Sequence, residues 1–145
     1  MADERPDVPR EAVAEIRHGV MHLARRMRYA RGPDALSNNK LLVLSHLYRR
    51  GPSTAGDVAA AEGQRPQSLT RVFAELEADG LIARARDDRD RRQAVLSLTA
   101  EGLAALRRDM DARDAWLAAA LAGLGETERE VLRLAARLMD RLGEN

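Results

Sequence analysis

Five polar and basic residues within one short segment have side chains that can bind phosphate and base edges: Arg65, Gln67, Ser68, Thr70 and Arg71. An arginine guanidinium donates two parallel hydrogen bonds, which suits phosphate oxygens and the acceptor atoms of guanine. Because the segment opens a stretch with helical spacing, we expect these side chains at the exposed start of a helix, where they can enter the major groove of DNA. The alternative interpretation is a solvated helix face.

A second charged group lies at residues 87–92, between two β-compatible segments at 81–86 and 93–98. This pattern predicts a two-stranded hairpin with a charged tip. Arg91 or Arg92 at such a tip suits the narrow minor groove, where the negative potential is strong. Asp90 would repel phosphate unless it faced inward, so we interpret it as a brace that orients one of these arginines by a salt bridge. The alternative is an ordinary polar loop.

The spacing of apolar residues predicts the helices that hold these two groups. We expect helices over residues 11–29, 38–50, 55–61 and 66–79, a long one after residue 99 and a last one after residue 127. Their expected N-terminal caps are Ser37, Ser53 or Thr54, Thr99, and Thr127 in a capping box with Glu130.

The third and fourth of these helices have the spacing of a helix-turn-helix. Ala59 is the small residue where the helices cross, Gly63 lies in the turn, and Leu69 and Val72 face back. The acidic residues at the end of the fourth helix should point away from DNA, and Gly80 should end that helix in a left-handed conformation. The expected fold is mostly α, a winged helix-turn-helix with a two-stranded β wing and a helical dimerisation region.

The composition excludes several classes of protein. The 145 residues include no cysteine, so a disulfide, a thiolate zinc site and a cysteine redox switch are excluded. No glycine-rich phosphate loop, nucleophile elbow or acid pair is recognisable, so we expect neither an enzyme nor a cofactor. No signal peptide or membrane span is visible, so we expect a cytoplasmic protein. The net charge is +1, so any DNA binding must depend on where the arginines are placed.

The stretch from Asp90 to Thr99, followed by Gly102, resembles the wing signature of the MarR family, D-x-R-x5-L-T-x-x-G, and the match is complete. Residues 68–84, SLTRVFAELEADGLIAR, are similar to the recognition helix of that family and the entry to its wing. With the helical order, the resemblance covers nearly the whole chain. It implies a homodimer, held by the first and the last two helices, that binds a palindromic operator in double-stranded DNA and releases it when a small molecule binds. It also makes Arg92 the minor-groove arginine and Asp90 its partner.

We therefore expect one domain over residues 1–145, with a DNA-binding region at 36–98 and a helical dimerisation region at 8–32 and 99–145. The expected function is a sequence-specific transcriptional regulator, in its simplest form a repressor. An activator, or a constitutive binder without a ligand, fits the same sequence. The rival interpretation is a helical protein–protein adaptor on a winged-helix scaffold that does not bind DNA, and the near-neutral charge favours it. Arg71, Arg91 and Arg92 argue against the rival.

Two further sites have weaker signals. His18 and His22 are four residues apart and would share a helix face, as metal ligands do, but His46 is the only other histidine, so we assign no metal. The family resemblance suggests a pocket for a small aromatic effector, for which the candidate residues are Met21, His22, Arg25 and Tyr48. A packed seam between helices explains these residues equally well.

Overall fold

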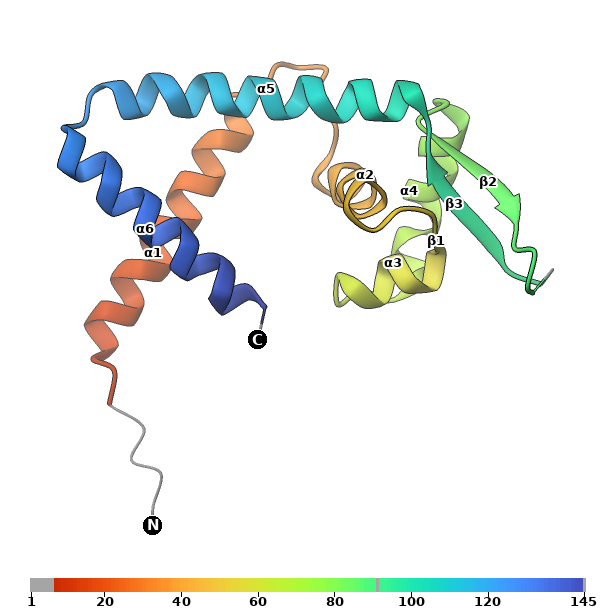
Figure 1. Ribbon diagram of the computed structural model, residues 1–145, viewed down its shortest axis with the longest axis horizontal. Helices are drawn as coiled ribbons and strands as arrows, with labels where there is room; N and C mark the ends of the chain where they lie inside the picture. The colour runs from red at the N-terminus through yellow and green to blue at the C-terminus, as the bar shows by residue number, and fades with distance from the viewer. Residues whose placement is uncertain (1–6, 91, 145) are drawn as a thin grey trace, which may run out of the picture. The chain divides into compact units, whose positions relative to one another are not determined.

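The computed structural model describes residues 7–90 and 92–144. Its elements are α1 (Arg10–Tyr29), α2 (Asn38–Arg50), β1 (Ser53–Thr54), α3 (Ala55–Ala61), α4 (Pro66–Ala78), β2 (Ile82–Arg86), β3 (Ala94–Leu98), α5 (Ala100–Ala122) and α6 (Glu126–Gly143) (Figure 1). The mostly helical fold with a β hairpin confirms the expected fold class. Within the described part of the chain, no helix is both long and apolar enough to cross a membrane.

The chain divides into two compact units. We call Pro33–Asp111 the winged unit, and Met1–Gly32 with Ala112–Asn145 the helical unit. The first part of α5 belongs to the winged unit, where Leu106 is buried in the hydrophobic core. The DNA-binding region predicted from the sequence ends earlier than this unit, at residue 98.

The core of the winged unit lies where α2, α3 and α4 pack against one face of the sheet. On α4 the buried side chains are Leu69, Phe73 and Leu76, which recur at the four- and three-residue steps of one helix face. Val72, expected to face back, is only partly buried and packs at the edge of this core. Ala59 is fully buried, which agrees with the expected crossing of α3 and α4.

Local capping defines where the helices of the winged unit begin. The Thr54 hydroxyl accepts the Asp57 N–H at 3.1 Å, and the Asp57 carboxylate accepts the Thr54 N–H at 3.3 Å. This capping box starts α3, and Ser37 caps α2 as expected by accepting the Lys40 N–H. The α3–α4 turn contains Gly63 with φ of +62°, a conformation that favours glycine.

The expected start of the last helix was wrong. The sequence predicts a capping box of Thr127 and Glu130, which would start the helix at residue 128. In the structure α6 begins two residues earlier, at Glu126. Gly125 precedes the helix, and its N–H donates to the Glu128 carboxylate at 2.8 Å. In a capping box the carboxylate at the third helical position accepts the N–H of the capping residue. Glu128 has this spacing from Gly125, as Glu130 has from Thr127, so the short pattern fits both starts.

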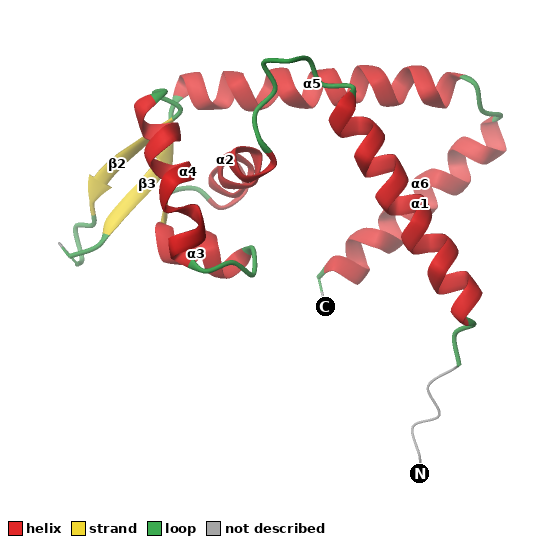
Figure 2. Cartoon of the chain, turned by 180° about the vertical axis from the view of Figure 1, so that it is seen from behind, coloured by secondary structure: helices red, strands yellow, loops and turns green. Residues whose placement is uncertain are grey.

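The wing is an antiparallel hairpin of β2 and β3, seen from behind beside α4 in Figure 2. Among the described residues the sheet has a third strand, because β1 pairs with the other edge of β3, with Ser53 opposite Leu96. The sequence predicts only a capping role for residues 53 and 54, because a two-residue strand is too short to show alternating apolar and polar residues. Strand β3 is therefore central.

The base of the wing is fastened to the end of α4. The Thr99 hydroxyl donates to the Gly80 carbonyl at 2.7 Å and accepts the Gly102 N–H at 3.0 Å, which caps α5 as expected. The Thr99 N–H donates to the Leu81 carbonyl at 3.2 Å. A Cβ on Gly102 would overlap the same Leu81 carbonyl oxygen and lie 2.8 Å from a methyl group of Leu98. The last part of the wing signature therefore builds a close junction, which we call the wing clamp (Thr99 and Gly102 against Gly80 and Leu81).

The two terminal helices are amphipathic and have no buried residues within this chain. Eleven of their large aliphatic side chains lie 40–72% exposed, which is unusual for a stable surface. On α1 these are Val13, Ile16, Val20, Met21 and Leu23, and on α6 they are Val131, Leu132, Leu134, Leu138, Met139 and Leu142.

Candidate nucleic-acid interface

The exposed face of α4 lies opposite its buried face and begins at the α3–α4 turn. All five residues expected there are exposed: Arg65, Gln67, Ser68, Thr70 and Arg71. Pro66 fills the first helical position, where no N–H is needed. The Thr70 hydroxyl donates to the Pro66 carbonyl at 3.2 Å, so its oxygen remains free to accept a further hydrogen bond.

Arg71 has an ion-pair partner although its side chain is 91% exposed. Its Nε donates to Glu75 Oε1 at 2.9 Å, one helical turn further along. The other oxygen of Glu75 lies 3.2 Å from Nζ of Lys40, which comes from α2. Lys40 also reaches Asp79 Oδ2 at 3.4 Å. The four side chains form a chain of ion pairs, which we call the Lys40 network.

The charges in this network shift two pKa values. Desolvation lowers the pKa of Lys40, but hydrogen bonds and charge interactions with Glu75 and Asp79 outweigh it, so the pKa is raised above its ordinary value. Hydrogen bonds from Lys40 and then Arg71 lower the pKa of Glu75. Both shifts keep the groups ionised at neutral pH.

The acidic residues on the second half of α4 are each paired with a cation. Glu77 accepts a hydrogen bond from Nε of Arg84 on β2 at 3.1 Å, which ties the helix to the wing. Glu75 and Asp79 are paired with Lys40. Pairing reduces the repulsion that these carboxylates would exert on a phosphate backbone.

At the tip of the wing, Asp90 stabilises the turn through the backbone. Its Oδ1 accepts the Arg92 N–H at 3.0 Å, and its carbonyl accepts the Gln93 N–H at 3.0 Å. This side-chain bond runs to the main chain of Arg92. The salt bridge predicted from the sequence would run from Asp90 to the side chain of Arg91 or Arg92. Arg92 itself is exposed, and Arg91, the other expected contact, lies outside the described residues.

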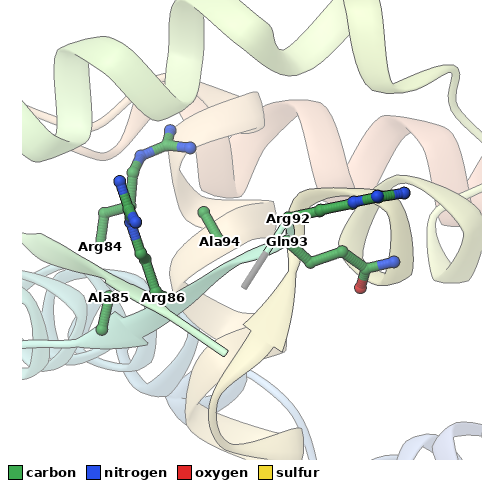
Figure 3. A pocket seen from close by; sticks show the side chains of 6 residues that line it. All are labelled: Arg84, Ala85, Arg86, Arg92, Gln93 and Ala94. Atoms are coloured by element: carbon green, nitrogen blue, oxygen red, sulfur yellow. The ribbon is translucent and has the colours of Figure 1, made fainter. Parts of the chain in front are cut away.

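The wing carries further arginines besides the two that the sequence predicts to contact DNA. A shallow hollow is lined by Arg84, Ala85, Arg86, Arg92, Gln93 and Ala94. Figure 3 shows Arg84 and Arg86 extending together from β2, and Arg92 and Gln93 extending on the other side of the hollow. Arg84 and Arg86 are two residues apart on one strand and so share a face of the sheet. That alternation was visible in the sequence and could have identified them.

The remaining candidates do not form a site within the described residues. The rings of His18 and His22 are 5.9 Å apart, and residues 7–90 and 92–144 contain no group of three metal-binding side chains. His46 is buried, with Nε2 3.3 Å from the Ser53 hydroxyl, which explains it as a core residue. Met21 and Tyr48, two of the effector candidates, are more than half exposed.

A helix pair joined by a glycine turn, packed on a third helix and followed by an antiparallel hairpin, defines a winged helix-turn-helix protein. Residues 36–93 match the model of the MarR family. A helix-turn-helix transcriptional regulator of Mycobacterium tuberculosis is 36% identical over 126 residues, which cover 87% of this chain and 88% of the relative. The chain belongs to the MarR family of transcriptional regulators.

Solved structures agree with this fold. A putative transcriptional regulator of Pseudomonas aeruginosa is 34% identical, with a TM-score of 0.82 over 93% of this chain and 95% of its own. A mutant of the Staphylococcus aureus protein MepR, bound to an oligodeoxyribonucleotide, is 20% identical, with a TM-score of 0.65 over 95% of this chain and 99% of its own. The relatives named here are regulators and not enzymes.

Proposed function

We propose that this protein is a repressor that binds a palindromic operator as a homodimer. The observation that carries the proposal is the placement of arginines in the winged unit. One set lies on the exposed face of α4 and another on the adjacent hairpin, while the acidic residues of α4 are paired. The DNA bound to the similarly folded Staphylococcus aureus protein supports this use of the fold.

In the proposal, the start of α4 enters the major groove. Arg71 and Gln67 lie one helical turn apart on the exposed face and have the side chains that read guanine and adenine edges. Ser68 and Thr70 add hydroxyl groups, and Arg65, at the N-terminal cap, lies where a phosphate would pass.

The wing then reaches the adjacent minor groove. Arg92 enters it, with Arg91 as the second candidate, because a narrow groove attracts a guanidinium. Asp90 acts as the brace by holding the turn from which Arg92 projects. Arg86 faces the same hollow and supplies charge along the strand, beside Arg84, whose charge is paired with Glu77.

A second copy of this chain covers the apolar faces of α1 and α6. Side chains such as Ile16 at 58% and Leu138 at 51% exposure would otherwise remain in water. A twofold dimer presents two recognition helices to successive major grooves, about 34 Å apart, and so requires a palindromic site. Residues 36–98 form the DNA-binding region of this arrangement, and residues 8–32 and 99–145 form the dimerisation region. Occlusion of a promoter is the simplest way for such a dimer to repress transcription.

A small aromatic effector that releases the DNA completes the proposal, with Met21, His22, Arg25 and Tyr48 as candidate contacts. The protein acts in the cytoplasm, where it meets bacterial DNA. The rival proposal is a protein–protein adaptor on the same scaffold, which the net charge of +1 favours. It predicts that neither specific nor salt-dependent DNA binding will be found.

The test is fluorescence anisotropy of the purified protein with the intergenic DNA beside its own coding region and with a scrambled duplex, over a salt series. We expect tight binding to the first duplex only, with an affinity that falls steeply with salt because bound arginines displace counterions. Equal, weak binding to both duplexes would contradict the operator proposal for this DNA and favour the adaptor.

Two variants test the wing. Arg92→Ala and Arg89→Ala each remove one positive charge from the same tip, so their loss of general attraction to DNA is matched. If Arg92 enters the minor groove, only its variant loses affinity by more than about tenfold, while both melt as the wild type does. Equal losses would refute the assignment of Arg92.

A further inference from the structure

We propose that Glu75 is a positioning residue that aims Arg71 at one base of each half-site, and that Lys40 holds Glu75 for this purpose. The inference rests on the proposed function. It assigns a role in sequence recognition to a carboxylate and to a lysine from a different helix, neither of which is itself expected to contact a base.

The geometry of Arg71 carries the proposal. An arginine that is 91% exposed would ordinarily sample many rotamers, and fixing such a side chain on binding costs conformational entropy. Glu75 engages Nε at 2.9 Å, which leaves the two terminal nitrogens of the guanidinium unoccupied by this carboxylate. Two parallel N–H groups are what guanine O6 and N7 accept in the major groove. Glu75 therefore orients Arg71 before DNA arrives.

A carboxylate near DNA needs a cation to hold it. Glu75 is 41% exposed and lies on the same helix as the proposed base contacts, so alone it would repel the phosphates. Nζ of Lys40, from α2, lies 3.2 Å from its carboxylate, and the Lys40 side chain is only 20% exposed. Asp79 fixes the other side of the Lys40 ammonium at 3.4 Å. The direction of Glu75 is thus set by two helices of the same rigid core.

This arrangement makes Glu75 matter for specificity more than for affinity. Removing its charge weakens no phosphate contact and reduces repulsion, so binding to unrelated DNA should be unchanged or tighter. A glutamine there keeps an oxygen that can accept from Nε of Arg71, but the neutral bond is weaker than the charge-assisted one. The orientation of Arg71 would loosen, and the preference for one base would fall with it. Loss of a bidentate arginine–guanine contact corresponds to about 5- to 150-fold in discrimination at that base pair.

The test is in vitro selection from a random duplex library with the full-length protein, followed by sequencing of the bound fraction. Wild type, Arg71→Ala, Glu75→Gln and Lys40→Met are compared. Glu77→Gln is the matched control, because it neutralises a carboxylate on the same helix whose partner, Arg84, lies on the wing. Melting curves verify that every variant is folded, and Lys40→Met provides a second way to disturb Glu75 without altering α4.

We expect Arg71→Ala to lose selectivity at one position of each half-site by about tenfold or more, with smaller losses at that same position in Glu75→Gln and Lys40→Met. The double variant of Arg71 and Glu75 should lose no more than Arg71→Ala alone. Glu77→Gln should keep the wild-type preference there. If wild type enriches a sequence and Glu75→Gln enriches the same one with equal selectivity, the positioning role is refuted while the operator proposal stands. If wild type enriches no sequence, the proposed function itself fails, and the positioning role with it.

Discussion

Replacing Gly102 with alanine tests whether the wing clamp is as close as the structure shows. The new Cβ would overlap the Leu81 carbonyl oxygen, and that oxygen cannot rotate away because it accepts the Thr99 N–H. The overlap can be relieved only if α5 moves away from the turn that ends α4. Such a movement stretches the hydrogen bonds of Thr99 to Gly80 and to Leu81, at 2.7 and 3.2 Å.

The cost can be worked out from these contacts. Overpacking of a tight site costs about 1–3 kcal/mol, and each weakened hydrogen bond adds about 1 kcal/mol. Alanine regains up to about 1 kcal/mol because it favours the helix more than glycine does. The net expectation is a destabilisation of about 2–4 kcal/mol, which lowers the melting temperature of a chain of this size by roughly 4–16 °C.

The matched control is Gly56→Ala, the same substitution near the start of α3 in the same unit. A Cβ there would meet only the Thr54 hydroxyl at 3.8 Å, an ordinary contact distance. Thermal melts followed by circular dichroism at one fixed protein concentration should show this control within about 2 °C of wild type or above it. A Gly102→Ala variant that melts as the control does would show that α5 is not packed as closely against Leu81 as described.

Three further outcomes are expected. Thr54→Ala removes the capping box of α3 and should lower the free energy of unfolding by about 1 kcal/mol in urea titrations, whereas Thr70→Ala, in mid-helix, should change it much less. Because the pKa of Glu75 is lowered, the stability it provides is present above its ordinary pKa and is lost as the pH falls through the lowered pKa. Glu75→Gln should therefore show a shallower acid decline than wild type in melts from pH 6 to 3, and parallel curves would contradict this. Leu138→Arg should convert the proposed homodimer to a monomer in sedimentation velocity, and an unchanged dimer would show that Leu138 on α6 does not lie in the interface.

The periodic elements of this fold could be predicted from the sequence because their causes are local. Leu69 and Gly63 have the spacing that a helix-turn-helix requires, and both are placed as expected. The hydroxyl of Thr54 is followed by Asp57, so the start of α3 depended only on neighbouring residues. The two starts available for α6 show the limit of such signals, since carboxylates at both Glu128 and Glu130 fit the same pattern.

The contacts between distant residues could not be predicted, because nothing in a single sequence states which side chains meet. Lys40 and Glu75 are 35 positions apart and come together only after α2 packs on α4. Strand β1 is too short to alternate and exists only because β3 has a free edge. The polar residues of α4 were identifiable by type, and Arg71 and Glu75 have the four-residue spacing of a helical ion pair. Lys40, which pairs with Glu75 from another helix, was not identifiable in this way.

Lys40 is also a site for selective chemical labelling. It is the only lysine among 24 basic Lys and Arg residues, so apart from the terminal amine the chain offers amine-reactive reagents a single target. That target is the cation on which Glu75 and Asp79 converge. The extent of its acylation, read by mass spectrometry, therefore reports directly on whether the Lys40 network is closed. A single mass shift can thus follow the Lys40 network in a protein of wild-type sequence, with and without DNA.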